Sequence, residues 1–288
     1  MLSGAARAER TLQSGVDSHK IRAVVFDVGN TLWFGACWPD PAEIERLQAE
    51  PLRSMLVGWG TDIGGLAVHI VRKVHEAGDE AERTERARGG LREVDGPALL
   101  RGVLGTRGIV ITTEQADELW RATWIPERYF GVQLYPDSLD VLREVKALGL
   151  LVGINTNRPC TAEMHLPGLR DFGIAAYVDA VVCSGDTGYV KPHPSTFELV
   201  LDRLGVSAHE SVMVGDLAIA DMHGAKAVGM QTVWKLNGRY DLPPCADADY
   251  AIHNLTELLS LPIVPRRANA ASPADSLTPH DDENEDRY

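Results

Sequence analysis

The chain has 288 residues, of which 44% are hydrophobic and 24% charged, and its 28 Lys and Arg against 41 Asp and Glu give a net charge of −13. This composition excludes a chain that is disordered throughout, and the length suffices for one large domain or two smaller ones with a buried core. Because the net charge repels nucleic-acid backbones and anionic lipids, we expect small-molecule or protein partners rather than nucleic acid or a membrane. The sequence does not indicate an oligomeric state.

The four cysteines are far apart, and they form neither a C-x-x-C pair nor a zinc-ligand spacing. They are Cys37, Cys160, Cys183 and Cys245. Such a pattern is typical of thiols in a reducing compartment. No apolar run approaches the ~18 residues of a membrane helix, and the first twenty residues are too polar for a signal peptide. We therefore expect a cytoplasmic protein.

Residues 1–20 and 265–288 are rich in small, polar and acidic residues without apolar periodicity, so we expect both to be loosely ordered tails. Between them, the β-branched run 21–26 (IRAVVF) predicts a strand that is buried on both faces.

Residues 35–132 have the periodicity of helices. Apolar residues recur at three- and four-residue steps over 44–59 and again over 63–74. Thr112 and Gln115 have the spacing of a capping box before the helix DELWRATW, and a charged loop is expected near 83–92. The segment 35–132 is therefore predicted to be an inserted, all-helical cap.

After residue 132, helices and strands alternate. The patterns predict helices at 138–148, 195–204, 221–228 and 255–260, and strands at 150–155, 180–183, 211–214, 232–234 and 250–252. Such alternation indicates an α/β fold with a doubly wound, mostly parallel sheet. Its core would consist of residues 21–34 and 133–264.

Ligands of such sheets bind beyond the carboxyl ends of the strands. Those ends carry Asp27, Thr156 and Asp216, while Lys191 and Asp221 follow in the adjoining segments. A carboxylate attacks a phosphoryl group only if their repulsion is relieved, since two unit charges at 4 Å interact by about 4 kcal/mol at an effective dielectric of 20. A divalent cation on oxygen ligands, helped by Lys and Thr, provides that relief.

Four segments in order resemble the motifs of the haloacid dehalogenase-like (HAD) hydrolases. They are FDVGNTL (26–32), INTN (154–157), GYVKPHPSTF (188–197) and VGDLAIAD (214–221). The resemblance covers residues 21 to about 260, and the helical insertion is similar to the type 1 cap of the family. A HAD-like Rossmann-type core is thus implied.

The resemblance implies that Asp27 is the nucleophile of an aspartyl intermediate. Thr156 and Lys191 would hold the transferring group, while Asn157 would orient the substrate. The next residue, Arg158, either reaches the anion of the substrate or is an exposed loop residue. The implied cofactor is Mg²⁺, and its implied ligands are Asp27, the backbone carbonyl of Gly29, Asp216 and Asp221.

One position departs from the family pattern. HAD phosphatases usually have a second Asp two residues after the nucleophile as general acid and base, and here that residue is Gly29. General acid–base help is worth about 10² to 10⁴ in rate, so its loss disfavours poor leaving groups most and weighs against a phosphomutase. His69 and His75 of the insertion are either substitutes for this acid or solvated helix residues. Trp33, Phe34 and Trp38 either line the cleft or pack at a hinge.

We therefore expect a Mg²⁺-dependent phosphomonoesterase that acts on a small phosphorylated metabolite with a comparatively good leaving group. Two alternatives stay open. The first is a metal-independent 2-haloacid dehalogenase with the same nucleophile, a branch that also lacks the second Asp. The second is a catalytically weak binding or regulatory protein that keeps the fold and the metal site.

Overall fold

The computed structural model describes residues 20–35, 39–239 and 242–266. Most of the predicted tails 1–20 and 265–288, namely residues 1–19 and 267–288, lies outside the described residues, as do Cys37 and Trp38. None of the helices in the described ranges is both long and apolar enough to cross a membrane.

A six-stranded, all-parallel sheet forms the centre of the core, with the strand order β5-β4-β1-β6-β7-β8. The strands are β1 (Ala23–Phe26), β4 (Leu151–Thr156), β5 (Ala180–Cys183), β6 (Ser211–Gly215), β7 (Gln231–Lys235) and β8 (Tyr250–Ile252). At the end of β1, Phe26 pairs with Ile154 on one side and with Val214 on the other. The predicted doubly wound, mostly parallel sheet is confirmed.

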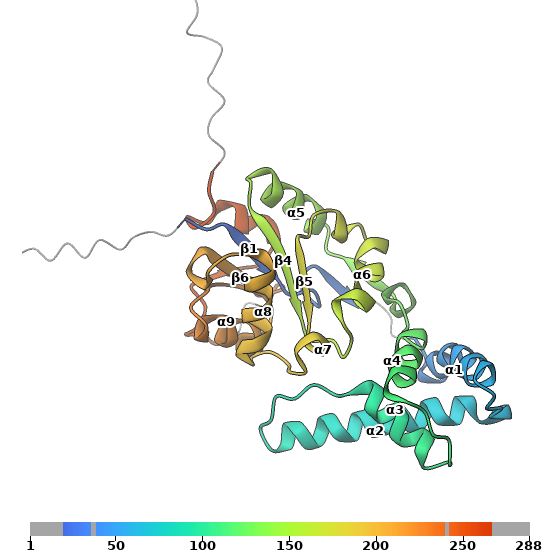
Figure 1. The fold of residues 1–288 in the computed structure, drawn as a ribbon. Helices are drawn as coiled ribbons and strands as arrows, with labels where there is room; N and C mark the ends of the chain where they lie inside the picture. Colours follow the sequence, from blue (N-terminus) through green and yellow to red (C-terminus); the bar gives the residue numbers. More distant parts are fainter. Residues whose placement is uncertain (1–19, 36–38, 240–241, 267–288) are drawn as a thin grey trace, which may run out of the picture.

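Helices cover both faces of the sheet (Figure 1). The core helices are α5 (Ser138–Ala147), α6 (Ala162–Asp171), α7 (Ser184–Thr187), α8 (Pro194–Leu204) and α9 (Gly224–Ala227), and the short helical turns are η3 (Ile174–Ala176), η4 (Ala208–Glu210), η5 (Ala218–His223) and η6 (Leu255–Ser260). Val24 and Phe26 pack with α5 and α6, whereas Ala23 and Val25 pack with α8 and α9. This alternation makes β1 apolar on both faces, as a central parallel strand requires.

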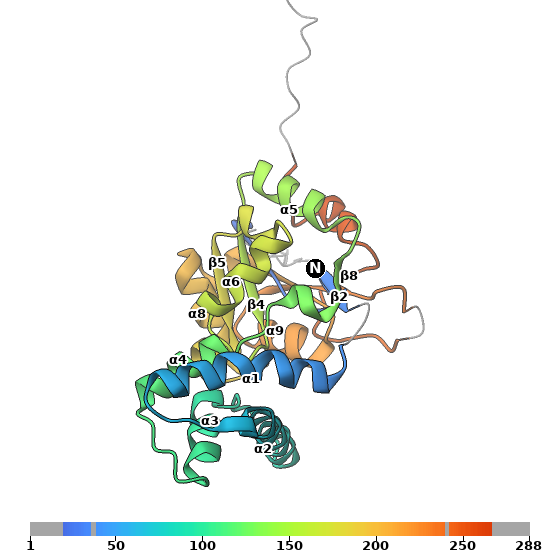
Figure 2. The same ribbon diagram turned by 90° about the vertical axis from the view of Figure 1, so that its right-hand side faces the viewer.

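The cap is built from four helices with a hydrophobic core of their own. Its elements are α1 (Pro41–Gly58), η1 (Gly64–Leu66), α2 (Ala67–Ala87), α3 (Gly96–Gly105), α4 (Thr113–Ala122) and η2 (Glu127–Phe130). The capping box expected before α4 forms in both directions between Thr112 and Gln115. Two perpendicular views place the cap beyond one end of the sheet (Figures 1 and 2). We propose that the cap consists of residues 35–132 and that the core consists of residues 21–34 and 133–264.

Two local predictions were wrong. The charged loop expected from residue 83 begins only after Ala87, because ion pairs three and four residues apart, such as Glu80–Arg83 and Glu82–Arg86, support a continued helix. The helix expected at 221–228 is instead the π-helical turn η5 followed by the short α9.

Strands β2 (Trp33–Gly35) and β3 (Val132–Leu134) were not predicted at all. They pair antiparallel, with Trp33 opposite Leu134, and join the two chain crossings between core and cap. Three residues are too few to show a period-two pattern, so the pairing is visible only in three dimensions.

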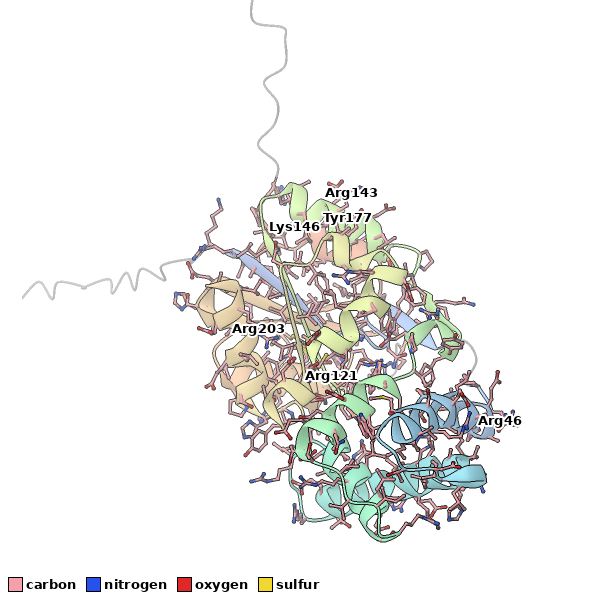
Figure 3. The ribbon with its side chains drawn as sticks, turned by 45° about the vertical axis from the view of Figure 1, so that its right-hand side comes forward. Arg46, Arg121, Arg143, Lys146, Tyr177 and Arg203 are labelled. Carbon is pink, nitrogen blue, oxygen red and sulfur yellow. The ribbon has the colours of Figure 1, made fainter. Side chains whose placement is uncertain are left out.

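The cap also contacts the core directly. The backbone N–H of Glu93 donates to the carbonyl of Gly188 (2.9 Å), and that of Val190 donates to the carbonyl of Leu91 (2.9 Å). Figure 3 shows Arg121 of α4 at the boundary between cap and core, whereas Arg46 of α1 lies on the outer side of the cap. The cap therefore faces the carboxyl ends of the strands and is hydrogen-bonded to the segment that leads into Lys191.

Candidate active site

Asp27 lies at the carboxyl end of the central strand β1. Its backbone N–H donates to the carbonyl of Val214 at the end of β6 (2.9 Å), and its side chain is only 11% exposed. The hydroxyl of Thr31 lies 3.4 Å from Asp27 Oδ2. Asp27 is therefore a fixed carboxylate at the edge of the sheet where ligands of such folds bind.

Lys191 links the parts of the site. Its buried ammonium donates to Asp27 Oδ1 (2.8 Å), to Asp221 Oδ1 (2.6 Å) and to the carbonyl of Asn155 (2.8 Å). Burial alone favours the neutral amine, but the carboxylates of Asp221 and Asp27 raise the pKa of Lys191 above its ordinary value. Lys191 is thus a permanent positive charge beside Asp27.

Both carboxylate oxygens of Asp221 are engaged within the protein. Oδ1 accepts from Lys191, and Oδ2 accepts from the backbone N–H of Leu217 (2.9 Å). Burial and the charge of Asp27 raise the pKa of Asp221 to about 6, although Lys191 opposes that shift. A Cβ at Gly215 would lie 2.3 Å from Asp221 Oδ2, so the carboxylate packs directly on that glycine. The π-helical turn η5 bends the chain to bring Asp221 to this place.

Asp216 completes an acidic cluster. The carboxylate oxygens of Asp27, Asp216 and Asp221 lie within 4.8 Å of one another, and all three residues are buried. Burial, together with the charges of Asp27 and Asp221, raises the pKa of Asp216 to about 7. Against three carboxylates stand the Lys191 ammonium and the half-exposed Arg239 guanidinium, which is 3.7 Å from Asp216 Oδ2, so one negative charge remains in excess and costs free energy in a buried site. This donor set of hard oxygen atoms fits a divalent cation such as Mg²⁺.

The loop after β4 lies beside Lys191. Asn157 Oδ1 accepts from the backbone N–H of Lys191 (2.7 Å), and Thr156 is buried at the end of β4, next to Asn155. Arg158 makes an ion pair with Glu127 of the cap linker (3.0 Å). Thr156 and Asn157 therefore lie beside Lys191 at the end of β4, whereas the Arg158 side chain is paired with Glu127 of the linker after α4.

Gly29 is exposed, and a Cβ at this position would meet no heavy atom of the described residues within 4 Å. Of the two histidines considered as substitutes for an acid, His69 is exposed, whereas half-buried His75 lies 2.7 Å from Gln48 Oε1 through its Nε2. Trp33 packs edge-on against His165 and Phe172 in the core, which is the hinge-packing arrangement.

Sequence reasoning missed two charged groups near the proposed reaction centre. Arg239 lies 3.7 Å from Asp216 Oδ2. The Glu127 carboxylate forms an ion pair with Arg158 (3.0 Å) and accepts a hydrogen bond from His165 Nδ1 (2.8 Å). Arg239 lies in the loop after β7, and Glu127 lies in the linker after α4. Neither belongs to a motif, so no sequence signal marks them.

Comparison with known proteins identifies the family. Haloacid dehalogenase-like hydrolase is the family that matches this chain, over residues 21–229. One similar protein is the glyceraldehyde 3-phosphate phosphatase of Methanocaldococcus jannaschii, with 37% identity over 128 residues; the matched region is 44% of this chain and 55% of that protein. Another is the ribulose-1,5-bisphosphate 5-phosphatase of Halopiger xanaduensis, with 38% identity over 138 residues; the matched region is 45% of this chain and 57% of that protein. The chain thus spans little more than half the length of these two relatives.

A solved structure extends the likeness over most of the chain. The 2-haloacid dehalogenase of Pseudomonas syringae pv. Tomato DC3000 is 26% identical with a TM-score of 0.53, and the match covers 83% of this chain and 97% of that one. The strand order, the contacts among Asp27, Lys191 and Asp221 of three of the motifs, and the family match over residues 21–229 lead to one conclusion. The chain belongs to the haloacid dehalogenase-like hydrolases.

Proposed function

We propose that this protein is a Mg²⁺-dependent phosphomonoesterase that acts on a small phosphorylated metabolite through an aspartyl-phosphate intermediate on Asp27. The observation that carries the proposal is the contact of Lys191 with both Asp27 and Asp221, with Asp216 in the same acidic cluster. The phosphatase names of two similar proteins support it.

Asp27, Asp216 and the backbone carbonyl of Gly29 would hold the metal, with Asp221 beside them as the partner of Lys191. Bound there, a divalent cation supplies charge neutralisation between two anions, the carboxylate and the phosphoryl group. The raised pKa of Asp216, caused by burial and neighbouring carboxylates, supports this assignment because it reports an uncompensated negative potential.

The reaction would proceed in two displacements. A carboxylate oxygen of Asp27 attacks phosphorus, and the bond to the ester oxygen breaks with its electron pair on the leaving group, which takes a proton from water. Water then attacks the phosphorus of the aspartyl phosphate, the bond to Asp27 breaks, and inorganic phosphate leaves. Lys191 fixes the orientation of Asp27, and with Thr156 it would bind the phosphoryl oxygens.

The test is phosphate release from a panel of phosphate esters, with Mg²⁺ or with EDTA. We expect release with Mg²⁺, loss of release in EDTA and a fall of at least about 10³-fold in Asp27→Asn, which removes the nucleophile. Asp140→Asn is the matched control, because this exposed carboxylate of α5 pairs only with nearby Arg143 at the surface.

The alternatives predict other results. Halide release from 2-haloacids without added metal, lost in Asp27→Asn, would replace the phosphatase with the dehalogenase. Turnover of neither substrate class would indicate a binding or regulatory protein.

We also propose that the protein works in the cytoplasm on a small phosphorylated substrate. Cys160, Cys183 and Cys245 are free thiols, and the first two are buried. Free thiols of this kind are typical of a reducing compartment. Retention in the cytosolic fraction after cell fractionation would test the assignment.

A further inference from the structure

A cavity of about 290 Å³ lies between the cap and the loop after β4. This volume is at the lower limit of the roughly 300–1,000 Å³ that is usual for small-molecule sites. Its walls come from α1, α2, α4, the linker after α4 and the loop after β4, and they include Ile44, Trp120, Trp124, Phe130 and Arg158. Cap and core are thus both needed to enclose it.

The cavity is connected to the proposed reaction centre through the chain itself. Arg158 follows Thr156 by two residues, which is about 7 Å of fully extended backbone. Asn157, between them, is hydrogen-bonded to the backbone of Lys191. Trp120 Nε1 donates to the carbonyl of Pro159 (3.2 Å), so α4 is attached to the same loop. Within the loop after β4, the cavity wall at Arg158 therefore adjoins Thr156 and Asn157, which are proposed to bind the phosphoryl group and to orient the substrate.

The lining is aromatic and planar. The rings of Trp120 and Trp124 are 6.4 Å apart and tilted by 58°, and the Arg158 guanidinium lies 5.6 Å from the centre of the Trp124 ring. Phe130 adds a third ring to the wall. Such surfaces bind another flat ring with a large contact area and favourable ring–ring geometry.

The charges of the cavity are balanced. The guanidinium of Arg158 is paired with Glu127, and burial lowers the pKa of His75, which favours its neutral form. Two N–H donors of the lining, Trp124 Nε1 and Arg158 Nε, are buried without a hydrogen-bond partner among the residues that the structure describes. Both groups donate only, so they fit a ligand that carries an oxygen acceptor rather than an ionised group.

Gly29 points independently to the same kind of molecule. Among the described residues, no side chain lies within 4 Å of a Cβ at the position where HAD phosphatases usually carry the acid. A leaving oxygen that departs without proton transfer must be stable as an anion, as a phenolic oxygen is.

Resting on the proposed phosphatase function, we infer that the substrate is an aryl phosphate, whose uncharged aromatic ring occupies the cavity between Trp120, Trp124 and Arg158 and whose ring substituent accepts hydrogen bonds. The inference specifies the substrate class of the same site.

The test uses four phosphates that separate ring binding from leaving-group quality. 4-Nitrophenyl phosphate has an aromatic ring and a good leaving group. Benzyl phosphate has the ring but a poor leaving group, acetyl phosphate has a good leaving group but no ring, and ethyl phosphate has neither a ring nor a good leaving group. We expect 4-nitrophenyl phosphate to have the highest kcat/KM and benzyl phosphate to have a KM at least about tenfold below that of ethyl phosphate.

Two matched variants of α1 test the cavity. Ile44→Trp fills it and should raise the KM for both aromatic phosphates at least about tenfold, while kcat/KM for acetyl phosphate stays within about twofold. Val57→Trp, on the exposed side of the same helix, should change none of these values. Trp124→Phe removes one free donor and should raise the KM about fivefold more for 4-nitrophenyl than for phenyl phosphate.

Binding to the unmodified protein gives a readout without turnover. Tryptophan fluorescence should show phenylphosphonate binding at least about tenfold more tightly than methylphosphonate.

Hydrolysis of acetyl phosphate without preference for aromatic esters overturns the aryl inference and leaves the phosphatase proposal standing. No hydrolysis of any ester, with phenylphosphonate still preferred, supports the aromatic site and contradicts the phosphatase. Equal affinity for both phosphonates, or equal losses on all esters in Ile44→Trp, overturns the inference.

Discussion

Replacing Gly29 with Asp restores the acid at the position where the family usually has one, and the structure allows the change. Among the described residues, no heavy atom lies within 4 Å of a Cβ at Gly29, and the φ of Gly29 is not positive, so a side chain is neither blocked nor strained. Gly29 is exposed, so the introduced carboxyl would face the open side of the site, two residues after Asp27. The negative charge of Asp27 favours the protonated form of that carboxyl, which is the form that a general acid needs.

The expected gain depends on the leaving group. General acid help is worth about 10² to 10⁴ in rate, which corresponds to about 2.7 to 5.5 kcal/mol of activation free energy. Alkyl phosphates should gain most of this in Gly29→Asp, because an alkoxide leaves poorly without a proton. Aryl phosphates, whose phenolic oxygen leaves unaided, should change by less than about threefold.

The assay is kcat/KM for a series of esters with leaving groups of graded pKa, with Gly29→Asn and Gly29→Ala as controls. The Asn variant has the same shape as Asp without an acidic proton, and the Ala variant tests the loss of glycine alone. The argument is supported if kcat/KM depends less steeply on the leaving-group pKa in Gly29→Asp than in the wild type, and if neither control variant shows this change. The same gain for alkyl and aryl esters, or the same gain in Gly29→Asn, would refute it.

Two further predictions concern the charges of the site. In the metal-free fold the pKa of Asp216 is raised from 3.8 to about 7, so the folded state binds the proton of this carboxyl more tightly than the unfolded state does. This contribution to the free energy of unfolding is complete below about pH 4 and is lost as the pH rises to 7, by at most about 4 kcal/mol. Urea unfolding in EDTA at pH 4.5 and 7.5 should show a larger loss in the wild type than in Asp216→Asn, which keeps only the smaller contribution of Asp221 with its pKa of about 6; identical losses in both would exclude Asp216 as a source. Lys191→Met leaves Asp27 and Asp221 buried without their counter-charge and should lower the free energy of unfolding at pH 7.5 by about 3–5 kcal/mol. Lys146→Met, which breaks a partly exposed pair with Asp179, should cost at most about 1 kcal/mol, and comparable losses in the two variants would contradict the argument.

The parallel core was predictable from the sequence because its signals are local. Each strand is a short apolar run, and the first polar residue after it lies at the edge where ligands bind. Asp27 and Asp216 follow β1 and β6 directly, and these two strands are neighbours in the sheet. Their proximity therefore needs no information beyond strand ends and strand order.

Contacts made by irregular segments were not predictable in this way. Asp221 was expected at a helix start, yet it is brought to Lys191 by a π-helical turn that has no sequence signature of its own. Glu127 pairs with Arg158 and His165 across chain separations that no periodicity encodes. Strands β2 and β3 were missed for the same reason, because each is too short to be identified without the strand with which it pairs.

This difference separates what the family determines from what this chain determines. Strand ends fix Asp27 and Asp216 relative to one another, and hydrogen bonds hold Lys191 of the segment before α8 against Asp27, so a family resemblance transfers the chemistry of the reaction centre to these positions. Trp120 and Trp124 lie instead in and just after the last helix of the inserted cap, and their neighbours across the cavity come from the core loop. Selection of the substrate therefore depends on how one particular insertion packs against a shared sheet, and variants at Ile44 and Gly29 test these two levels separately.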